Sequence, residues 1–250
     1  MIKPALLFII VVLLSLTAVG QKPIIDTIQN LVNKGSYAEL DSFISYCHGF
    51  KGTEYACSKT SRTIIDSFDA SGFSLESFSR KRMDRSLSIV TIECSGQIAY
   101  AELNIVPDDN KPPKQIMKYS NKQLLDALFA DYQKTYNTNL NIDTLFNWGM
   151  EYGHGCGLAG IELEYAKKLK AILKSNSMAE LDIWLRSPIL EIQIYALNGF
   201  NQLKQKGYAL TPDELRLINI IKSKKGTITT CQGCIVSKTN VEDVIKNFKF

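Results

Sequence analysis

The chain has 250 residues, of which 45% are hydrophobic and 22% charged, and it carries a formal net charge of +4. This composition excludes a disordered or low-complexity chain, and the length suffices for one large or two small domains that bury their own core. The basic excess is too weak to indicate nucleic-acid binding.

The first twenty residues are typical of a secretory signal peptide. Lys3 is their one charge, residues 5–14 form an apolar run, and Ala18 and Gly20 supply small side chains before a cleavage site at Gln21. The run is shorter than the ~20 residues that span a bilayer, so we expect a cleaved leader and no stable membrane span. The mature protein is then exported, to the periplasm or the medium.

Two stretches of the chain are alike, residues 31–45 (LVNKGSYAELDSFIS) and residues 172–186 (ILKSNSMAELDIWLR). Both contain Ser-x-Ala-Glu-Leu-Asp at the same point, and a Tyr-Ala pair follows at residues 55–56 and 195–196. We predict a duplicated unit, an antiparallel helix pair followed by a third helix. The alternative is that two helix starts are similar without a common origin.

Helix signals dominate the C-terminal part. Capping boxes predict helix starts at Ser177 and Thr211, because each has a glutamate three residues later that can bond back to the capping residue. Pro188 opens another helix, which lysines and Gly207 end. A further helix is predicted to be capped at Ser120.

In the middle of the chain the spacing of apolar residues changes from a helical to a strand-like pattern. Residues 87–106 alternate and are rich in branched side chains around Ser95 and Gly96, which predicts a β-hairpin. A polar, proline-containing connector follows at residues 108–114. The predicted organisation is a signal peptide (1–20), an N-terminal helical unit plus β-hairpin (21–110) and a C-terminal helical domain (111–250).

Residues 181–203, LDIWLRSPILEIQIYALNGFNQL, resemble a HEAT-type helical hairpin, with a leucine-rich first helix, a Ser-Pro turn and an alanine-centred second helix. The resemblance implies stacked helices that bind other macromolecules through a concave face. The expected fold class is therefore mainly α, with HEAT-like antiparallel helical hairpins in two related units and an intervening β-hairpin.

The chain contains six cysteines, an even number, and all of them follow the predicted leader. In an exported protein this pattern favours disulfides, although the sequence leaves their pairing open. The candidate disulfide residues are Cys47, Cys57, Cys94, Cys156, Cys231 and Cys234.

Residues 151–160, EYGHGCGLAG, resemble the calcium-binding loop of secretory phospholipases. The matching residues are Tyr152, Gly153, Cys156, Gly157 and Gly160. The resemblance implies a calcium ion held mainly by backbone carbonyl oxygens. That family also needs a following helix with a His-Asp pair, and residues 161–176 contain neither residue, so no catalytic residue is assigned.

Three chemical alternatives remain for this region. His154, Cys156, Cys231 and Cys234 have the residue types and spacing of a tetrahedral zinc site. Residues 230–234 (TCQGC) contain a Cys-x-x-Cys pair like that of thiol oxidoreductases, but too little chain follows to complete the fold that such a pair needs. Cys156 as a nucleophile, with His154 or His48 as its base, is a further arrangement.

We interpret the sequence as an exported, disulfide-stabilised, non-enzymatic binding or scaffold protein without a required cofactor. Its expected partner is a protein or a cell-envelope component. In this interpretation the glycine-rich turn is tied by a disulfide from Cys156 to Cys231 or Cys234, and the glycines allow close backbone packing. The alternative is a zinc- or calcium-dependent hydrolase, or a thiol-based site, centred on His154 and Cys156.

Overall fold

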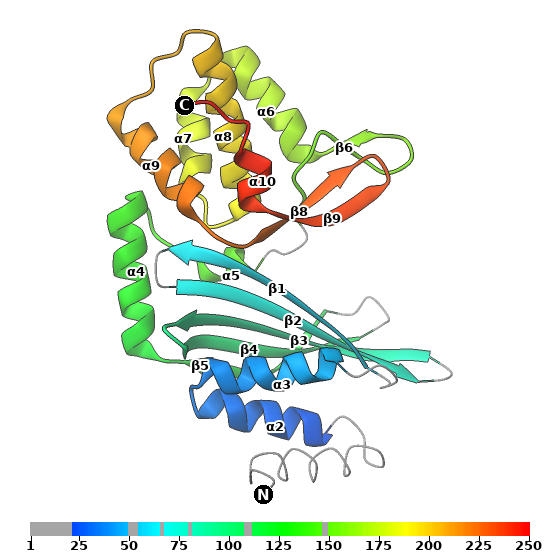
Figure 1. Ribbon diagram of the computed structural model, residues 1–250. Helices are drawn as coiled ribbons and strands as arrows, with labels where there is room; N and C mark the ends of the chain where they lie inside the picture. The colour runs from blue at the N-terminus through cyan, green and yellow to red at the C-terminus, as the bar shows by residue number, and fades with distance from the viewer. Residues whose placement is uncertain (1–21, 50–54, 66–67, 80–81, 108–111, 147–149) are drawn as a thin grey trace, which may run out of the picture.

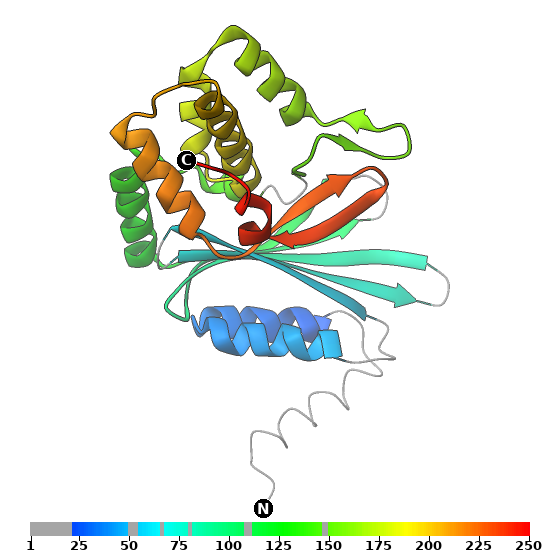
Figure 2. The same cartoon turned by 45° about the horizontal axis from the view of Figure 1, so that its top comes forward.

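The computed structural model describes residues 22–49, 55–65, 68–79, 82–107, 112–146 and 150–250. The predicted signal peptide lies outside these residues. Figures 1 and 2 show a central sheet with the two N-terminal helices along one face and the C-terminal helices beyond the other.

The sheet is an antiparallel meander in which each strand pairs with the next one along the chain. Its strands are β1 (Tyr55–Ile65), β2 (Phe68–Ser79), β3 (Arg82–Cys94), β4 (Gln97–Pro107) and β5 (Lys114–Ser120). The predicted β-hairpin is confirmed as β3 and β4, and Ser95 and Gly96 form its turn with φ angles of 51° and 82°. Both faces of β3 are apolar because both are covered: Leu87 and Ile89 contact one core cluster, Val90 and Ile92 the other.

The N-terminal helices α2 (Lys22–Asn33) and α3 (Tyr37–Gly49) cover one face of the sheet. Ile28 and Leu40 pack there with Ile98 and Leu103 of β4, and all four side chains are buried. The turn between the helices is fixed to the β3–β4 turn, since the amide of Ile98 donates to the carbonyl of Gly35 (2.8 Å).

The remaining helices form a layer beyond the opposite face. They are α4 (Lys122–Tyr136), α5 (Ile142–Leu145), α6 (Glu164–Ser175), α7 (Met178–Leu185), α8 (Leu190–Gln205), α9 (Pro212–Ser223) and α10 (Val241–Ile245). Helix α8 is the centre of this layer, and most of its side chains are buried. Its Ile194 and Phe200 belong to the same core cluster as Phe68 and Ile92 of the sheet, so sheet and helices share one core.

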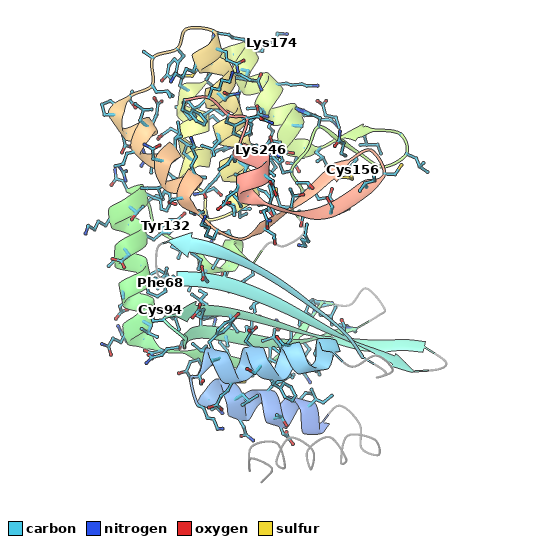
Figure 3. All side chains as sticks on the ribbon, in the orientation of Figure 1. Phe68, Cys94, Tyr132, Cys156, Lys174 and Lys246 are labelled. Atoms are coloured by element: carbon cyan, nitrogen blue, oxygen red, sulfur yellow. A yellow bond between two sulfur atoms is a disulfide. The ribbon has the colours of Figure 1, made fainter. Side chains whose placement is uncertain are left out.

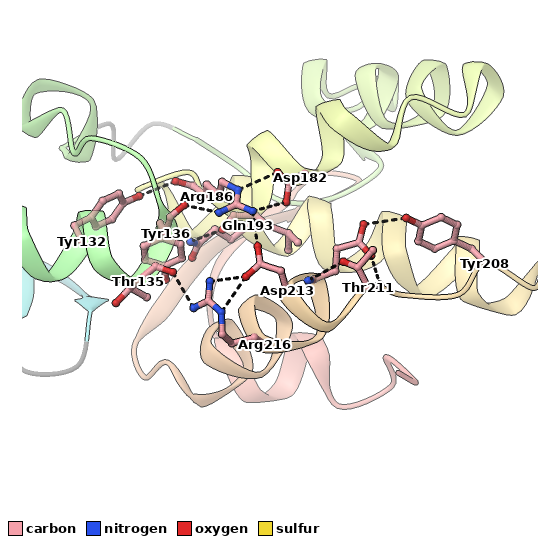
Figure 4. A network of polar contacts seen from close by, with 12 residues as sticks. Tyr132, Thr135, Tyr136, Asp182, Arg186, Gln193, Tyr208, Thr211, Asp213 and Arg216 are labelled. Carbon is pink, nitrogen blue, oxygen red and sulfur yellow. Dashed lines mark hydrogen bonds and ion pairs between the residues drawn. The ribbon is translucent and has the colours of Figure 1, made fainter.

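A polar network fastens the C-terminal end of α4 to α7 and α9 (Figure 4). The Arg186 guanidinium forms two hydrogen bonds with Asp182 (2.9 and 3.0 Å) and one with Asp213 (2.7 Å). It also donates to the carbonyl of Tyr136 (2.5 Å), and the Tyr132 hydroxyl donates to the carbonyl of Arg186 itself (2.8 Å). One arginine therefore joins three helices.

The predicted fold class is wrong. The described residues contain a five-stranded sheet and two separate two-stranded sheets, where the sequence predicted a mainly α protein with a single β-hairpin. The first copy of the supposed duplication has the helix pair but no third helix, because Tyr55 begins β1. The predicted boundary after residue 110 lies between β4 and β5, which pair with each other.

The helix caps agree with the sequence in part. The Thr211 capping box is confirmed, with Pro212 at the start of α9. At Ser177 the helix starts as predicted, but the serine side chain makes no capping hydrogen bond. Asn121 caps α4 by accepting a hydrogen bond from the Leu124 amide (3.3 Å), whereas Ser120, the predicted cap, ends β5.

Candidate functional site

The glycine-rich segment lies alongside the second half of β8 and the turn that follows it. Two short hairpins meet there: β6 (Gly155–Cys156) with β7 (Ile161–Glu162), and β8 (Thr227–Gln232) with β9 (Ile235–Asn240). Tyr152 and Cys156 form parallel bridges to Thr230 and Gly233. We call the assembly of residues 152–162 and 227–240 the paired hairpins; they lie together at the right of Figures 1 and 2.

A disulfide between Cys156 and Cys231 links the two hairpins, with their Cα atoms 5.4 Å apart. Figure 3 shows Cys156 at this junction. Cys231 and Cys234 were the two partners expected for Cys156, and the observed partner is Cys231. Among the described side chains, Cys234 is an exposed free thiol and Cys94 a partly buried one. Cys47 and Cys57 lie in α3 and β1, and their side chains are outside the described part of the structure, as is that of His48.

Two glycines allow the backbones to approach this closely. A Cβ atom on Gly153 would lie 2.1 Å from the carbonyl oxygen of Cys231, which no side chain tolerates. A Cβ atom on Gly155 would lie 2.9 Å from the carbonyl oxygen of Gly160. Close backbone packing, expected from the sequence for all the glycines, therefore explains Gly153 and Gly155, whereas Gly157 and Gly160 have open space around them and positive φ angles of 80° and 57°.

A buried tyrosine holds the segment from the helix side. The Tyr195 hydroxyl, on α8, accepts a hydrogen bond from the Gly153 amide (3.0 Å) and donates to the Gly153 carbonyl (2.8 Å). Burial raises the pKa of Tyr195 to about 12, so the hydroxyl stays protonated at neutral pH. The ring of Tyr152 packs on that of Tyr195 at 4.7 Å between centroids.

The carbonyls of the calcium-like loop are already engaged inside the protein. Those of Tyr152 and Gly155 accept hydrogen bonds from the amides of Cys231 and Gly233 (2.9 and 3.2 Å). The carbonyl of His154 accepts from the Leu163 amide (3.3 Å). The loop is thus closed by hydrogen bonds from its neighbours, and a calcium ion would compete with them.

The predicted zinc ligands are only partly brought together. Cys156 and Cys231 are adjacent, but as a disulfide they offer no thiolate, while His154 and Cys234 are exposed side chains on the surface. The structure instead places a carboxylate oxygen of Glu151 within 4.8 Å of both sulfur atoms. Sequence reasoning missed Glu151, although it immediately precedes Tyr152 in the glycine-rich segment.

The end of the paired hairpins exposes aliphatic side chains. The exposed fractions are 98% for Leu158, 67% for Ile161, 69% for Ile235 and 55% for Val236. We call these four residues the aliphatic tip. Residues 155–161 (GCGLAGI) and 232–237 (QGCIVS) contain no charged residue. This surface was not predicted from the sequence, because its residues come from two hairpins that are far apart in the chain.

A polar hollow of about 390 Å³ lies elsewhere, between the α2–α3 turn and the β3–β4 turn. Its lining includes Lys34, Gln97, Tyr119 and Asn121. Lys34 forms an ion pair with Glu39 (3.1 Å), so the charge in this lining is already compensated. The hollow offers no grouping of reactive side chains.

Comparisons with protein-family models, with curated proteins and with solved structures find no match to this chain. Within the described ranges, no helix has the length and apolarity to cross a membrane. The likeness of residues 181–203 to a HEAT hairpin and that of residues 152–160 to a calcium loop therefore stay predictions.

Proposed function

We propose that the protein is an exported, non-enzymatic binding or scaffold protein of the cell envelope or the secreted space, and that the aliphatic tip is its binding surface. The observation that carries the proposal is the exposure of Leu158, Ile161, Ile235 and Val236 on two hairpins that the Cys156–Cys231 disulfide joins. Clustered exposed aliphatic side chains mark interaction sites, because burying them on a partner is favourable.

The structure around the tip supports this role. The Cys156–Cys231 disulfide and the hydrogen bond from the Gly157 amide to the Gly233 carbonyl (2.6 Å) hold the two hairpins in one arrangement. A surface that is already ordered loses less conformational entropy on binding. The sequence also carries no serine-hydrolase elbow, no zinc-protease helix motif and no phosphate loop.

The test is retention of the mature protein, residues 21–250, on the envelope of its source cell. The envelope is divided into membranes and soluble proteins, and the bound fraction is measured for each. We expect Ile235→Asp to lower retention several-fold, whereas Ile183→Asp leaves it unchanged. Ile183→Asp is the matched control, because Ile183 is as exposed as Ile235 (66% and 69%) but lies on α7, outside the aliphatic tip.

Two outcomes contradict the proposal. One is that the unaltered protein is retained by neither envelope fraction. The other is that both variants retain the binding of the unaltered protein, which would place the contact away from the aliphatic tip.

A second candidate is a metal site at Glu151, Cys156 and Cys231, in place of the predicted set with His154 and Cys234. The closeness of the Glu151 carboxylate to the two sulfurs favours it. Zinc binding there requires reduction of the disulfide to two thiolates. Elemental analysis of the protein with and without reductant tests this candidate, and zinc bound at one equivalent, lost in Glu151→Gln, supports it.

A further inference from the structure

We infer that the partner of the aliphatic tip is a lipid surface, into whose interfacial region the tip inserts without crossing the bilayer. This inference rests on the proposed function and names its partner class. It gives the protein a peripheral attachment to a membrane through the paired hairpins alone.

The composition of the tip fits lipid better than a protein groove. Its side chains are a leucine, two isoleucines and a valine. Protein interfaces concentrate binding energy in tryptophan, tyrosine and arginine, and residues 155–161 and 232–237 contain none of these. Acyl chains require no matching pocket, so aliphatic side chains suffice for insertion.

Part of the backbone around the tip is already paired. The Gly157 amide donates to the carbonyl of Gly233 (2.6 Å), and the Gly160 amide donates to the carbonyl of Gly157 (3.0 Å). Residues 155–156 pair with 161–162, and β8 pairs with β9 along its length. Backbone groups that are already bonded can enter the interfacial region at low cost, and the turn and edge groups can bond to the water and headgroups of that region.

Basic side chains follow the β6–β7 hairpin in the first turns of α6 (Glu164–Ser175). Lys168 and Lys170 form ion pairs with Glu164 and Glu162. Lys167 is exposed and has no acidic partner among the residues that the structure describes. The flank is therefore mildly positive, which adds attraction to anionic headgroups.

The test is flotation of the disulfide-intact mature protein with lipid vesicles that contain no protein. One set is phosphatidylcholine alone, and the other contains phosphatidylglycerol as well. We expect binding to both sets, a few-fold stronger with phosphatidylglycerol. The double variant Leu158→Asp/Ile235→Asp should lower the partition coefficient at least tenfold, because it removes two aliphatic side chains from the buried set.

Ile183→Asp is the matched control and should bind vesicles as the unaltered protein does. Thermal unfolding and intact mass verify that each variant is folded with its disulfide closed. The inference is overturned if the unaltered protein does not float with either vesicle set, or if the double variant floats as well as the control. Retention on envelope proteins without binding to vesicles would overturn this inference and leave the proposed function standing.

Discussion

At position 153 only a hydrogen atom fits as the side chain. Gly153 faces the carbonyl oxygen of Cys231, and its amide and carbonyl are both bonded to the Tyr195 hydroxyl. A larger residue would push β8 away from the glycine-rich segment, because backbone atoms cannot turn aside as a flexible side chain can.

We predict that Gly153→Ala lowers the free energy of unfolding by about 3 kcal/mol. Gly157→Ala is the control: it has open space around its Cβ position but a φ of +80°, so we expect a loss of about 1 kcal/mol. Urea unfolding measures both values. Equal losses would show that the close approach at Gly153 relaxes without cost.

Asp213 makes stability depend on acid pH. Hydrogen bonds from Arg186 and then Arg216 lower the pKa of this carboxyl below its usual value. A carboxyl with a lowered pKa in the folded state stabilises the protein fully above its unfolded pKa of about 4, and this contribution disappears as the pH falls through the folded value.

Asp213→Asn should therefore cost less than about 1 kcal/mol at pH 7, a small value because the side chain is half exposed. The difference from the unaltered protein should shrink below pH 4. Asp126→Asn, which removes an exposed pair with Lys122, is the control. Thermal unfolding from pH 7 to pH 2.5 gives the comparison, and a difference that does not change with pH would rule out this role for Asp213.

Among the elements, helices α4, α7 and α9 depend on Arg186. Its side chain is only 17% exposed, and a hydrogen bond with Asp182 raises its pKa, so it is charged at neutral and acid pH. Arg186→Ala should destabilise the protein by about 2 kcal/mol, since the Tyr136 carbonyl and the Asp182 carboxylate lose this donor and Asp213 keeps only Arg216.

Arg186→Lys should recover only part of this loss, because a lysine cannot form the forked pair with Asp182. Arg216→Ala, whose side chain is 44% exposed, should cost less than about 1 kcal/mol. Chemical unfolding of the three variants tests the ranking. An Arg186→Ala variant as stable as Arg216→Ala would contradict the assignment.

The sequence predicted the elements whose signals are local. The Thr211 capping box starts α9, and the Ser95-Gly96 turn joins β3 to β4, because short-range bonds decide both features. The strands β1 and β2 were missed, since their serine- and threonine-rich stretches carry no strong local strand signal and are held by their neighbours, β2 by β3 and β1 by β2. Asn121 replaced Ser120 as the cap of α4 because Ser120 is still held in the sheet by Tyr100.

The candidate site was predicted only in part from the sequence. Cys156 was expected to bond to one of two cysteines, and only the tertiary structure distinguishes them, because Cys231 is buried on β8 while Cys234 is exposed in the turn between β8 and β9. The aliphatic tip was missed because it is formed by two hairpins that are far apart in the chain. No single stretch of sequence shows their residues together.

For the whole molecule, the Cys156–Cys231 disulfide is the longest covalent constraint that the structure describes, with a separation of 75 residues. Cys156→Ser/Cys231→Ser should lower the free energy of unfolding by about 4 kcal/mol, the value expected for a closed loop of this length. Cys234→Ser, at an exposed thiol, should change it little. Urea unfolding compares the two, and similar stabilities would show that the bond does not constrain the unfolded chain.

The same bond also closes residues 157–230 into a covalent ring that contains α6, α7, α8 and α9. A protease that cuts an exposed turn inside this ring, such as the one around Gly207, leaves two fragments that the disulfide still joins. On a denaturing gel the cut protein migrates as one band without reductant and as two bands with it. Such a ring lets the protein survive a single cut without losing a part.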